Sequence, residues 1–216
     1  MMKWPAMDAL PALIPMPEGY HLEGLGRTHV PALIAAIREW HPEISVGVGA
    51  GFLREEFYRD RVCLDGDLDK DVWAVRIMFG NDMVGILSIE REVDSLALYG
   101  RVLAVAPAHR GTKISVHSME GYENIGRAMG AAFIYGLATL KHPYMQRALE
   151  RAGFRLLGFL PGYDRSEVSP GVVKRVYQSI YAKLLVPGDE VHWPDTKGMT
   201  PEAKRIYELM FADRPR

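Results

Sequence analysis

Three apolar segments follow one another between Trp73 and Ala106, and only short links separate them. Apolar residues alternate with other residues from Trp73 to Phe79, which is typical of a half-buried strand. Residues 84–92 and 96–106 are predicted to form a second and a third strand. The links are too short for crossover connections, so the sequence predicts an antiparallel meander.

The order of predicted elements changes after this meander. A helix is expected over 112–130, a strand buried on both faces over 131–140, and a short helix over 143–152. Two further strands are expected over 154–160 and 174–186. The chain therefore reads as a mixed α/β (α+β) domain, in which the N-terminal antiparallel meander is followed by a β-α-β-α-β unit.

The two ends of the chain differ from this middle part. Residues 1–19 are rich in Pro and Met and are predicted to be an irregular lead-in. A short strand is expected near 20–26, and helices are expected after Thr28 and near 52–62. We therefore assign one domain to 20–186. Residues 187–216 are predicted to form a tail with one helix, which could cover a sheet edge or form a homodimer together with Trp193.

Composition excludes several classes of protein. The 26 Lys and Arg residues nearly balance the 27 Asp and Glu residues, which argues against a dedicated nucleic-acid or membrane-surface binder. Cys63 is the only cysteine, so a disulfide framework and a Cys-cluster zinc site are excluded, and the His spacing predicts no metal site. No apolar run is long enough to span a bilayer, and prolines interrupt the N-terminus. We expect a cytoplasmic protein without a metal.

A tight loop joins the third predicted strand to the long helix, from Pro107 to Lys113. The first backbone N–H groups of a helix have no partner inside the helix, and the helix dipole adds positive charge there. A pyrophosphate fits such a place. The sequence therefore favours a phosphate-containing ligand at this loop, although an exposed basic turn would show the same residues.

The run Leu103–Gly111, followed by a helix, a buried strand, a short helix and Ala152–Phe154, resembles the GNAT superfamily of acyl-CoA-dependent N-acetyltransferases. The resemblance covers about residues 20–186. It implies a mixed sheet whose fourth and fifth strands splay apart around acetyl-CoA. The implied cofactor-binding residues are Leu103, Ala104, Val105, Arg110, Gly111, Thr112, Lys113, Ile114, Ser115, Gln146 and Arg147.

The sequence departs from the pattern of this family at three positions. Lys113 stands where Gly is usual, and Ser115 stands where Gly or Ala is usual. The Lys113 side chain could point away, could add a cation for a CoA phosphate, or could mark a degraded site. Leu149 occupies the position of the Tyr that protonates the CoA thiolate in the family.

The resemblance also implies catalytic positions. The usual general base lies eleven residues before Arg110, at Tyr99, although Tyr is a poor base unless its pKa is lowered, and a core aromatic is the alternative. His142 and Tyr144 follow the buried strand, where the thioester is expected, and His142 could act as a base or simply precede a helix.

Acceptor-binding residues are predicted on neighbouring segments. Glu90 and Glu92 could attract a cationic amine or could lie on an exposed strand edge, and Arg101 could bind a substrate carboxylate or be a surface charge. Tyr163 and Asp164 belong to a predicted loop, 161–165, that would border the acceptor site or form a simple Pro-Gly turn.

Two functional classes follow from the resemblance. The first is an N-acetyltransferase that moves an acetyl group from acetyl-CoA to a primary amine of a small molecule or a peptide, by direct attack in a ternary complex. The second is a non-catalytic sensor or partner subunit that binds CoA or acyl-CoA. A variant of the first class transfers a long acyl chain, which would require a tunnel.

Overall fold

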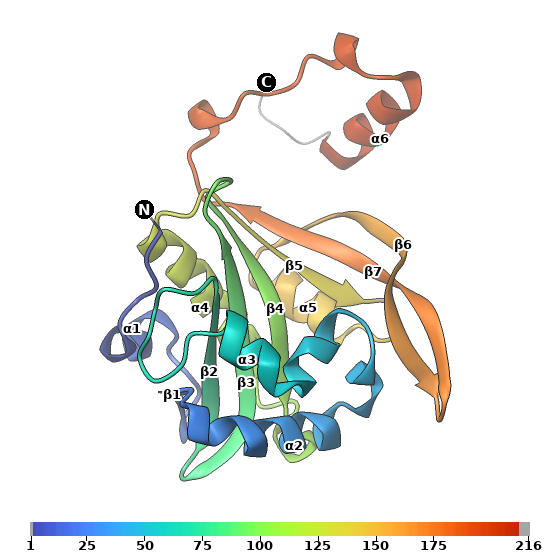
Figure 1. The fold of residues 1–216 in the computed structure, drawn as a ribbon. Helices are drawn as coiled ribbons and strands as arrows, with labels where there is room; N and C mark the ends of the chain where they lie inside the picture. Colours follow the sequence, from blue (N-terminus) through green and yellow to red (C-terminus); the bar gives the residue numbers. More distant parts are fainter. Residues whose placement is uncertain (1, 212–216) are drawn as a thin grey trace. The chain divides into compact units, whose positions relative to one another are not determined.

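The structure is a computed structural model, and it describes residues 2–211. Residues 2–185 form one compact unit, and the described residues from 186 onward belong to a second. The first unit contains a seven-stranded mixed sheet with the order β1-β2-β3-β4-β5-β7-β6 (Figure 1). Its strands are β1 (Tyr20–Gly24), β2 (Val72–Phe79), β3 (Asp82–Glu92), β4 (Ala97–Val105), β5 (Phe133–Thr139), β6 (Arg155–Ser169) and β7 (Val172–Leu184).

Five α-helices accompany this sheet in the described part of the first unit. They are α1 (Leu10–Leu13), α2 (Val30–Trp40), α3 (Glu55–Arg61), α4 (Ile114–Met129) and α5 (Tyr144–Arg151). Short 3₁₀ helices cover Met7–Ala9, Arg27–His29, Pro42–Ser45, Val48–Leu53 and Pro107–His109. The second unit has 3₁₀ turns at Gly188–Glu190 and Thr196–Gly198 and the helix α6 (Pro201–Phe211). Within residues 2–211, no helix has both the length and the apolar character needed to cross a membrane.

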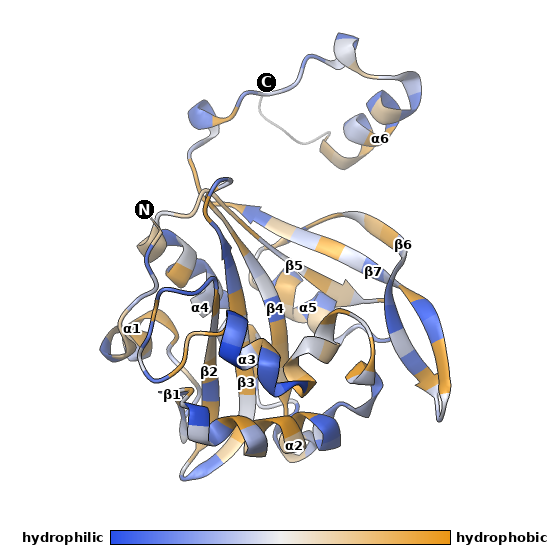
Figure 2. Ribbon diagram, in the orientation of Figure 1, coloured by the Kyte–Doolittle hydropathy of each residue, from blue (hydrophilic) through white to orange (hydrophobic). Residues whose placement is uncertain are grey.

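The strands β2, β3 and β4 pair antiparallel in sequence order, which confirms the predicted meander. Side chains alternate between the two faces of the sheet. Trp73, Val75 and Leu87 belong to a core shared with α4 and α5, whereas Ala74 and Ile86 belong to a core shared with α2 and α3. Helices α2 and α3 thus cover one face, and α4 and α5 cover the other (Figure 1). In Figure 2 most of α3 is hydrophilic, while β3 is largely hydrophobic.

The N-terminal segment is more ordered than its composition predicts. It contains two helical turns, and Met2, Trp4 and Leu10 are buried in the core on the α4 side. The Trp4 ring stacks on Trp73 with 5.8 Å between ring centroids. The prediction of an irregular lead-in is therefore wrong in part, because its apolar residues complete the hydrophobic core.

The predicted loop at 161–165 is also wrong. Strand β6 continues to Ser169 and forms a long hairpin with β7. The pairing skips from Leu160 to Asp164, so Pro161 and Gly162 form an irregularity inside the strand. Pro and Gly are tolerated at such bulges, where the ladder of hydrogen bonds is interrupted.

Candidate functional site

The central strands β4 and β5 part halfway along their length. They pair in parallel from Ala97 to Gly100 on β4 and from Phe133 to Gly136 on β5, and then diverge (Figure 1). Among the described residues, no strand pairs with this edge of β4 between Arg101 and Val105. The predicted splayed strands are confirmed, and we call the point where the strands part, after Gly100 and Gly136, the fork.

A β-bulge lies at the fork. On β3, Ile89 pairs with Gly100 and Ser88 pairs with Val102, so Arg101 is an extra residue of β4. Phe52 and Phe57 lie within 6.0 Å of the Arg101 guanidinium, which places this side chain on the face covered by α2 and α3. Bulges often redirect side chains beside active sites.

Helix α4 begins just beyond the end of β4. Within residues 2–211, the backbone N–H groups of Gly111, Thr112, Lys113, Ile114 and Ser115 donate to no acceptor. The Thr112 hydroxyl donates to the His109 carbonyl at 2.7 Å and fixes the loop. A row of free amides at the start of a 16-residue helix can hold an anionic group such as a pyrophosphate.

Lys113 has the backbone conformation that a glycine would adopt. Its φ is 68° and its ψ is 1°, which is left-handed, and its side chain is exposed. Gly111 also has a positive φ, of 84°. The loop therefore has the backbone conformation that glycine favours at this position. Lys113 adopts it with more backbone strain than a glycine would have.

The Arg110 side chain is held by the protein itself. Its guanidinium donates to the Trp40 carbonyl at 2.6 Å and to the Val105 carbonyl at 3.2 Å. These bonds join the end of α2 to the end of β4. Because the guanidinium is engaged in this way, we expect the backbone of the loop, rather than this side chain, to contact a phosphate.

Tyr99 lies on β4 two residues before the bulge. Its ring stacks on Tyr135 with 5.0 Å between centroids. Burial raises the pKa of Tyr99 to about 12, and the charges of Tyr163, Arg101, Asp164 and Glu90 also affect this pKa. The predicted site residues on β3, β4 and β6 are thus close enough to influence one another. A phenol with this pKa stays protonated at neutral pH, so Tyr99 carries a proton and cannot act as a base in the resting protein.

Glu92 is occupied by a neighbouring tyrosine. The Tyr135 hydroxyl donates to Glu92 Oε1 at 2.6 Å, and burial and this bond raise the pKa of Tyr135. The Ser95 hydroxyl also donates to the Glu92 carboxylate, at 3.3 Å. Glu92 therefore lies beside the fork with its carboxylate already accepting two hydrogen bonds from the protein.

Glu90 lies between two arginines. Arg61 of α3 donates to its carboxylate at 2.6 Å, and Arg101 forms an ion pair with its other oxygen. The exposed fraction of the side chain is 16% for Glu90 and 19% for Arg101. The expectation that Glu90 attracts a cationic amine is not supported, because two guanidinium groups already surround this carboxylate.

His142 and Tyr144 lie beyond the end of β5, away from the fork. A strand rises about 3.3 Å per residue, so β5 extends roughly 10 Å from Gly136 to Thr139 before His142 is reached. Both side chains are exposed, Tyr144 by 73%, and their ring centroids are 4.9 Å apart. Burial lowers the pKa of His142. We therefore do not place these two residues at the thioester.

Helix α5 contributes packing near the fork and hydrogen bonds at the end of β5. Leu149 is buried and lies 4.0 Å from the position that a Gly136 Cβ would take. The Gln146 side-chain amide donates to the carbonyls of Thr139 and His142, whereas Arg147 is exposed. Gln146 thus orders the end of β5.

Asp164 joins β6 to the segment after α2. Its Oδ1 accepts from the Val48 N–H at 2.9 Å, and its Oδ2 accepts from the Gln178 amide at 3.2 Å. A cavity of about 100 Å³ lies beside it, lined also by Lys141 and His142. Tyr163 is 48% exposed on the same strand.

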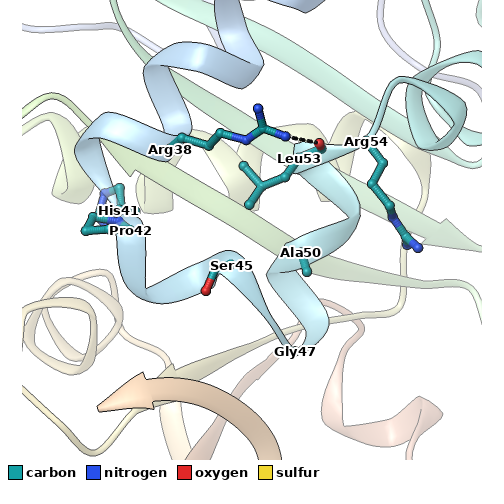
Figure 3. A pocket seen from close by; sticks show the side chains of 8 residues that line it. All are labelled: Arg38, His41, Pro42, Ser45, Gly47, Ala50, Leu53 and Arg54. Atoms are coloured by element: carbon teal, nitrogen blue, oxygen red, sulfur yellow. Dashed lines mark hydrogen bonds between the residues drawn. The ribbon is translucent and has the colours of Figure 1, made fainter. Parts of the chain in front are cut away.

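A larger cavity of about 660 Å³ lies within the segment from Arg38 to Arg54 (Figure 3). The Arg38 guanidinium donates to the Leu53 carbonyl at 3.2 Å and so bridges the segment. The lining residues are Arg38, His41, Pro42, Ser45, Gly47, Ala50, Leu53 and Arg54. The lining includes two arginines and a histidine but no carboxylate.

Several residues of the site carry no local signal in the sequence. Arg61, Phe52 and Phe57 approach Arg101 from residues 52–61, far earlier in the chain, and only the tertiary fold brings them together. Tyr135 lies in a nearly continuous apolar run. Within residues 2–211, no three His, Cys, Asp or Glu side chains are grouped to hold a metal ion.

Comparisons with known proteins agree with this geometry at the level of the fold. No protein-family model and no curated protein sequence matches the chain. Among solved structures, the apo form of RimL, a ribosomal alpha-N-protein acetyltransferase, is 18% identical with a TM-score of 0.55, over 80% of this chain and 97% of that chain.

Two further structures have the same arrangement. The microcin self immunity acetyltransferase MccE, solved with acetyl-CoA and AMP, is 13% identical with a TM-score of 0.61, over 78% of this chain and 94% of that chain. Spermidine N-acetyltransferase from Vibrio cholerae is 14% identical with a TM-score of 0.58, over 78% and 95%. The GNAT superfamily fold predicted from the sequence is confirmed.

Proposed function

We propose that this protein is an N-acetyltransferase that transfers an acetyl group from acetyl-CoA to a primary amine of a small molecule or a peptide. The observation that carries the proposal is the row of free amides from Gly111 to Ser115, next to the parted strands β4 and β5. The amides suit the pyrophosphate of CoA, and the unpaired edge of β4 suits its pantetheine arm. The solved acetyltransferases with this fold include complexes with acetyl-CoA and CoA.

The reaction needs one bond to form and one to break. The amine nitrogen attacks the thioester carbonyl carbon, the C–S bond breaks, and CoA leaves as a thiolate. Tyr99 remains protonated near neutral pH because burial raises its pKa to about 12. Tyr99 gives its proton to the thiolate and then takes a proton from the acetylated nitrogen, so the charges balance.

Proximity supplies most of the rate enhancement in this proposal, since the thioester is already activated. The arm of CoA between the strands would bring the thioester to the fork, where Tyr99 and Arg101 lie. The acceptor would enter from the face covered by α2 and α3, which carries the larger cavity. No covalent enzyme intermediate is part of this mechanism.

A second candidate is a non-catalytic domain that binds CoA or acyl-CoA. It is favoured by one observation, the buried Leu149 at the position where the family has a proton-donating tyrosine. In the enzyme, Tyr99 has to supply this proton from β4 instead. The long-chain variant would also require a tunnel beside β5.

Calorimetry with CoA and acetyl-CoA, followed by a thiol-release assay across a panel of primary amines, tests the proposal. We expect one CoA site and release of CoA thiol with some amines. An absence of both heat and thermal shift at millimolar CoA would overturn the enzyme and the binding domain together. Binding without turnover across the panel would favour the non-catalytic domain.

A further inference from the structure

We propose that the acceptor carries a carboxylate near its amine and that Arg101 and Arg61 bind this carboxylate. The inference rests on the proposed acetyl transfer and specifies its acceptor as the class of amino acids, rather than polyamines or simple alkylamines. It follows from the arrangement of charges at the fork and on the face covered by α2 and α3.

Glu90 holds the two guanidinium groups close together. Each of them uses an N–H donor for a Glu90 oxygen, and within the described residues neither has another hydrogen-bond acceptor. A guanidinium offers several N–H donors, so both retain donors for a ligand. The Arg101 Nε is buried and donates to no acceptor within the described residues, which is a costly state that a ligand oxygen would relieve.

Aromatic side chains fix the Arg101 guanidinium in place. Its centre lies 5.4 Å from the Phe57 ring, 5.7 Å from the Tyr99 ring and 6.0 Å from the Phe52 ring. Rings against a guanidinium leave its edge of N–H groups for planar acceptors. A carboxylate matches that edge with two parallel hydrogen bonds.

The cluster of Glu90 and its two arginines can take up an anion. Arg61 and Arg101 carry two positive charges, and Glu90 supplies one negative charge between them, so this cluster has one net positive charge. Glu92 and Asp164 keep their negative charges, because their partners are neutral donors, a phenol for Glu92 and backbone N–H groups and the Gln178 amide for Asp164. Neither of these two carboxylates pairs with Arg61 or Arg101 within the described residues, so both guanidinium groups can bind the carboxylate of an acceptor.

The larger cavity is a second and independent observation. It is lined by Arg38, Arg54 and His41 and by no carboxylate (Figure 3). Leu53 lines the cavity, and Phe52, the preceding residue, contacts Arg101. The cavity lining thus adds two arginines on the same face of the sheet as Arg101, although the whole chain has a formal net charge of −1.

The position of Arg101 limits the distance between the amine and the carboxylate. Arg101 is the bulged residue at the fork and lies two residues after Tyr99. Because the amine has to reach the thioester beside Tyr99, its carboxylate can lie only a few bonds away. This geometry fits α-amino and β-amino acids, either free or at a chain end.

The experiment compares amino acids with the amines that remain after decarboxylation, for example phenylalanine with 2-phenylethylamine, as acceptors of acetyl-CoA. For the pair that the protein uses best, we expect kcat/KM to be at least about tenfold higher for the amino acid than for its decarboxylated amine. Arg101→Gln is expected to lower kcat/KM about tenfold or more further for amino acids than for the decarboxylated amines, so that the preference within each pair is lost. Arg101→Lys keeps the charge but lacks the planar array of N–H donors. Its kcat/KM for amino acids should therefore lie between those of the parent protein and Arg101→Gln.

A matched control and a binding measurement complete the test. Arg59→Gln changes an exposed arginine that pairs with Asp60 on the same helix, and it should leave the preference unchanged. In the presence of CoA, N-acetylated amino acids should bind more tightly than N-acetylated decarboxylated amines. This second measurement does not depend on turnover.

Two results would overturn the inference and leave the proposed function intact. One is equal kcat/KM for both members of every pair, and the other is equal binding of both product classes to the CoA complex. Failure to bind CoA would instead contradict the proposed function itself. Thermal unfolding of each variant separates a loss of folding from a loss of recognition.

Discussion

Tyr99 shows how burial sets the chemistry of a single side chain at the fork. Its pKa of about 12 has desolvation as the main cause, and the neutral phenol is therefore favoured at any pH in which the protein works. The resemblance to acetyltransferases placed Tyr99 at the position of a general base. Its raised pKa keeps it protonated, so in the proposed reaction Tyr99 supplies the proton that the family's tyrosine, replaced here by Leu149, would donate.

Replacing Tyr99 by Phe is expected to lower kcat on the order of a hundredfold, because the thiolate then has no proton donor. CoA binding should change less than about threefold. In the parent protein this donor is protonated below its raised pKa, so kcat should not fall on account of Tyr99 until the pH approaches about 12. Tyr177→Phe, an exposed tyrosine on β7, is the control. Normal turnover by Tyr99→Phe would remove Tyr99 from the mechanism.

Some contacts of the site could be predicted residue by residue, and others could not. Tyr99, Arg101 and Glu90 lie in a short stretch whose order of strands is readable from the sequence. The pairing of Glu90 with Arg61 joins residues 29 positions apart and depends on how α3 packs against the sheet. Local patterns carry no information on that packing.

At the scale of elements, the loop before α4 depends on backbone shape more than on side chains. The left-handed conformation of Lys113 turns the chain so that the following amides are free. A lysine in this conformation costs about 1–2 kcal/mol relative to its ordinary conformation. The loop therefore tolerates Lys in place of the usual Gly, and the amides stay available.

Lys113→Gly is expected to keep CoA affinity within about threefold, because Gly adopts the same φ without strain. Lys113→Val is expected to weaken CoA binding more than about tenfold, since a β-branched residue resists a positive φ. Calorimetry with CoA, together with the unfolding free energy in urea, measures both effects. Equal affinities of the Gly and Val variants would show that the loop does not hold the pyrophosphate.

The long helix α4 was predicted correctly from the sequence, although two glycines lower the helix propensity of this stretch. A Cβ on Gly121 would lie 2.5 Å from Ile14, and a Cβ on Gly126 would lie 2.7 Å from Leu185. Both glycines therefore permit close packing inside a regular helix. In β6, by contrast, Pro161 and Gly162 suggested a turn where the strand continues through a bulge. The same residue types serve packing, turns or bulges, and only tertiary contacts distinguish these roles.

Helix α4 also joins the two strands just before they part. The Tyr122 hydroxyl lies 2.5 Å from the Leu98 carbonyl of β4 and 3.0 Å from the Tyr135 carbonyl of β5. We expect Tyr122→Phe to lower the unfolding free energy by about 1–3 kcal/mol, because buried carbonyls lose their donor. Urea unfolding measures the loss, with Tyr177→Phe again as the control. An unchanged midpoint would mean that other groups satisfy these carbonyls.

At the scale of the whole first unit, the parted sheet is bridged on the face covered by α2 and α3. Residues 43–48, after α2, bond to β6 across the opening. Val48 N–H donates to Asp164 at 2.9 Å, and the Ser45 hydroxyl donates to Glu167 at 3.2 Å. Lys141, beyond the end of β5, donates to the Ser166 hydroxyl at 2.9 Å. This bridge forms one wall of the expected acceptor site.

The role of this bridge is open to a test with two glycines that both have a positive φ. The φ values of Gly47 and Gly66 are 86° and 84°, so alanine is strained at both positions, and the ψ of −162° at Gly47 lies in a region that is almost restricted to glycine. They differ in their surroundings. A Cβ on Gly47 would lie 2.2 Å from Asp164 Oδ1 and 2.3 Å from the Arg165 carbonyl, whereas nothing lies within 4 Å at Gly66.

We therefore expect Gly47→Ala to separate residues 43–48 from β6 and Gly66→Ala only to lower the unfolding free energy. Hydrogen exchange should rise at 43–48 and 164–167 in the first variant and stay unchanged there in the second. The KM for the acceptor should rise several-fold in Gly47→Ala while the affinity for CoA is kept, because the free amides of α4 do not belong to the bridge. If both variants keep the same acceptor KM, the bridge stabilises the fold but does not shape the acceptor site.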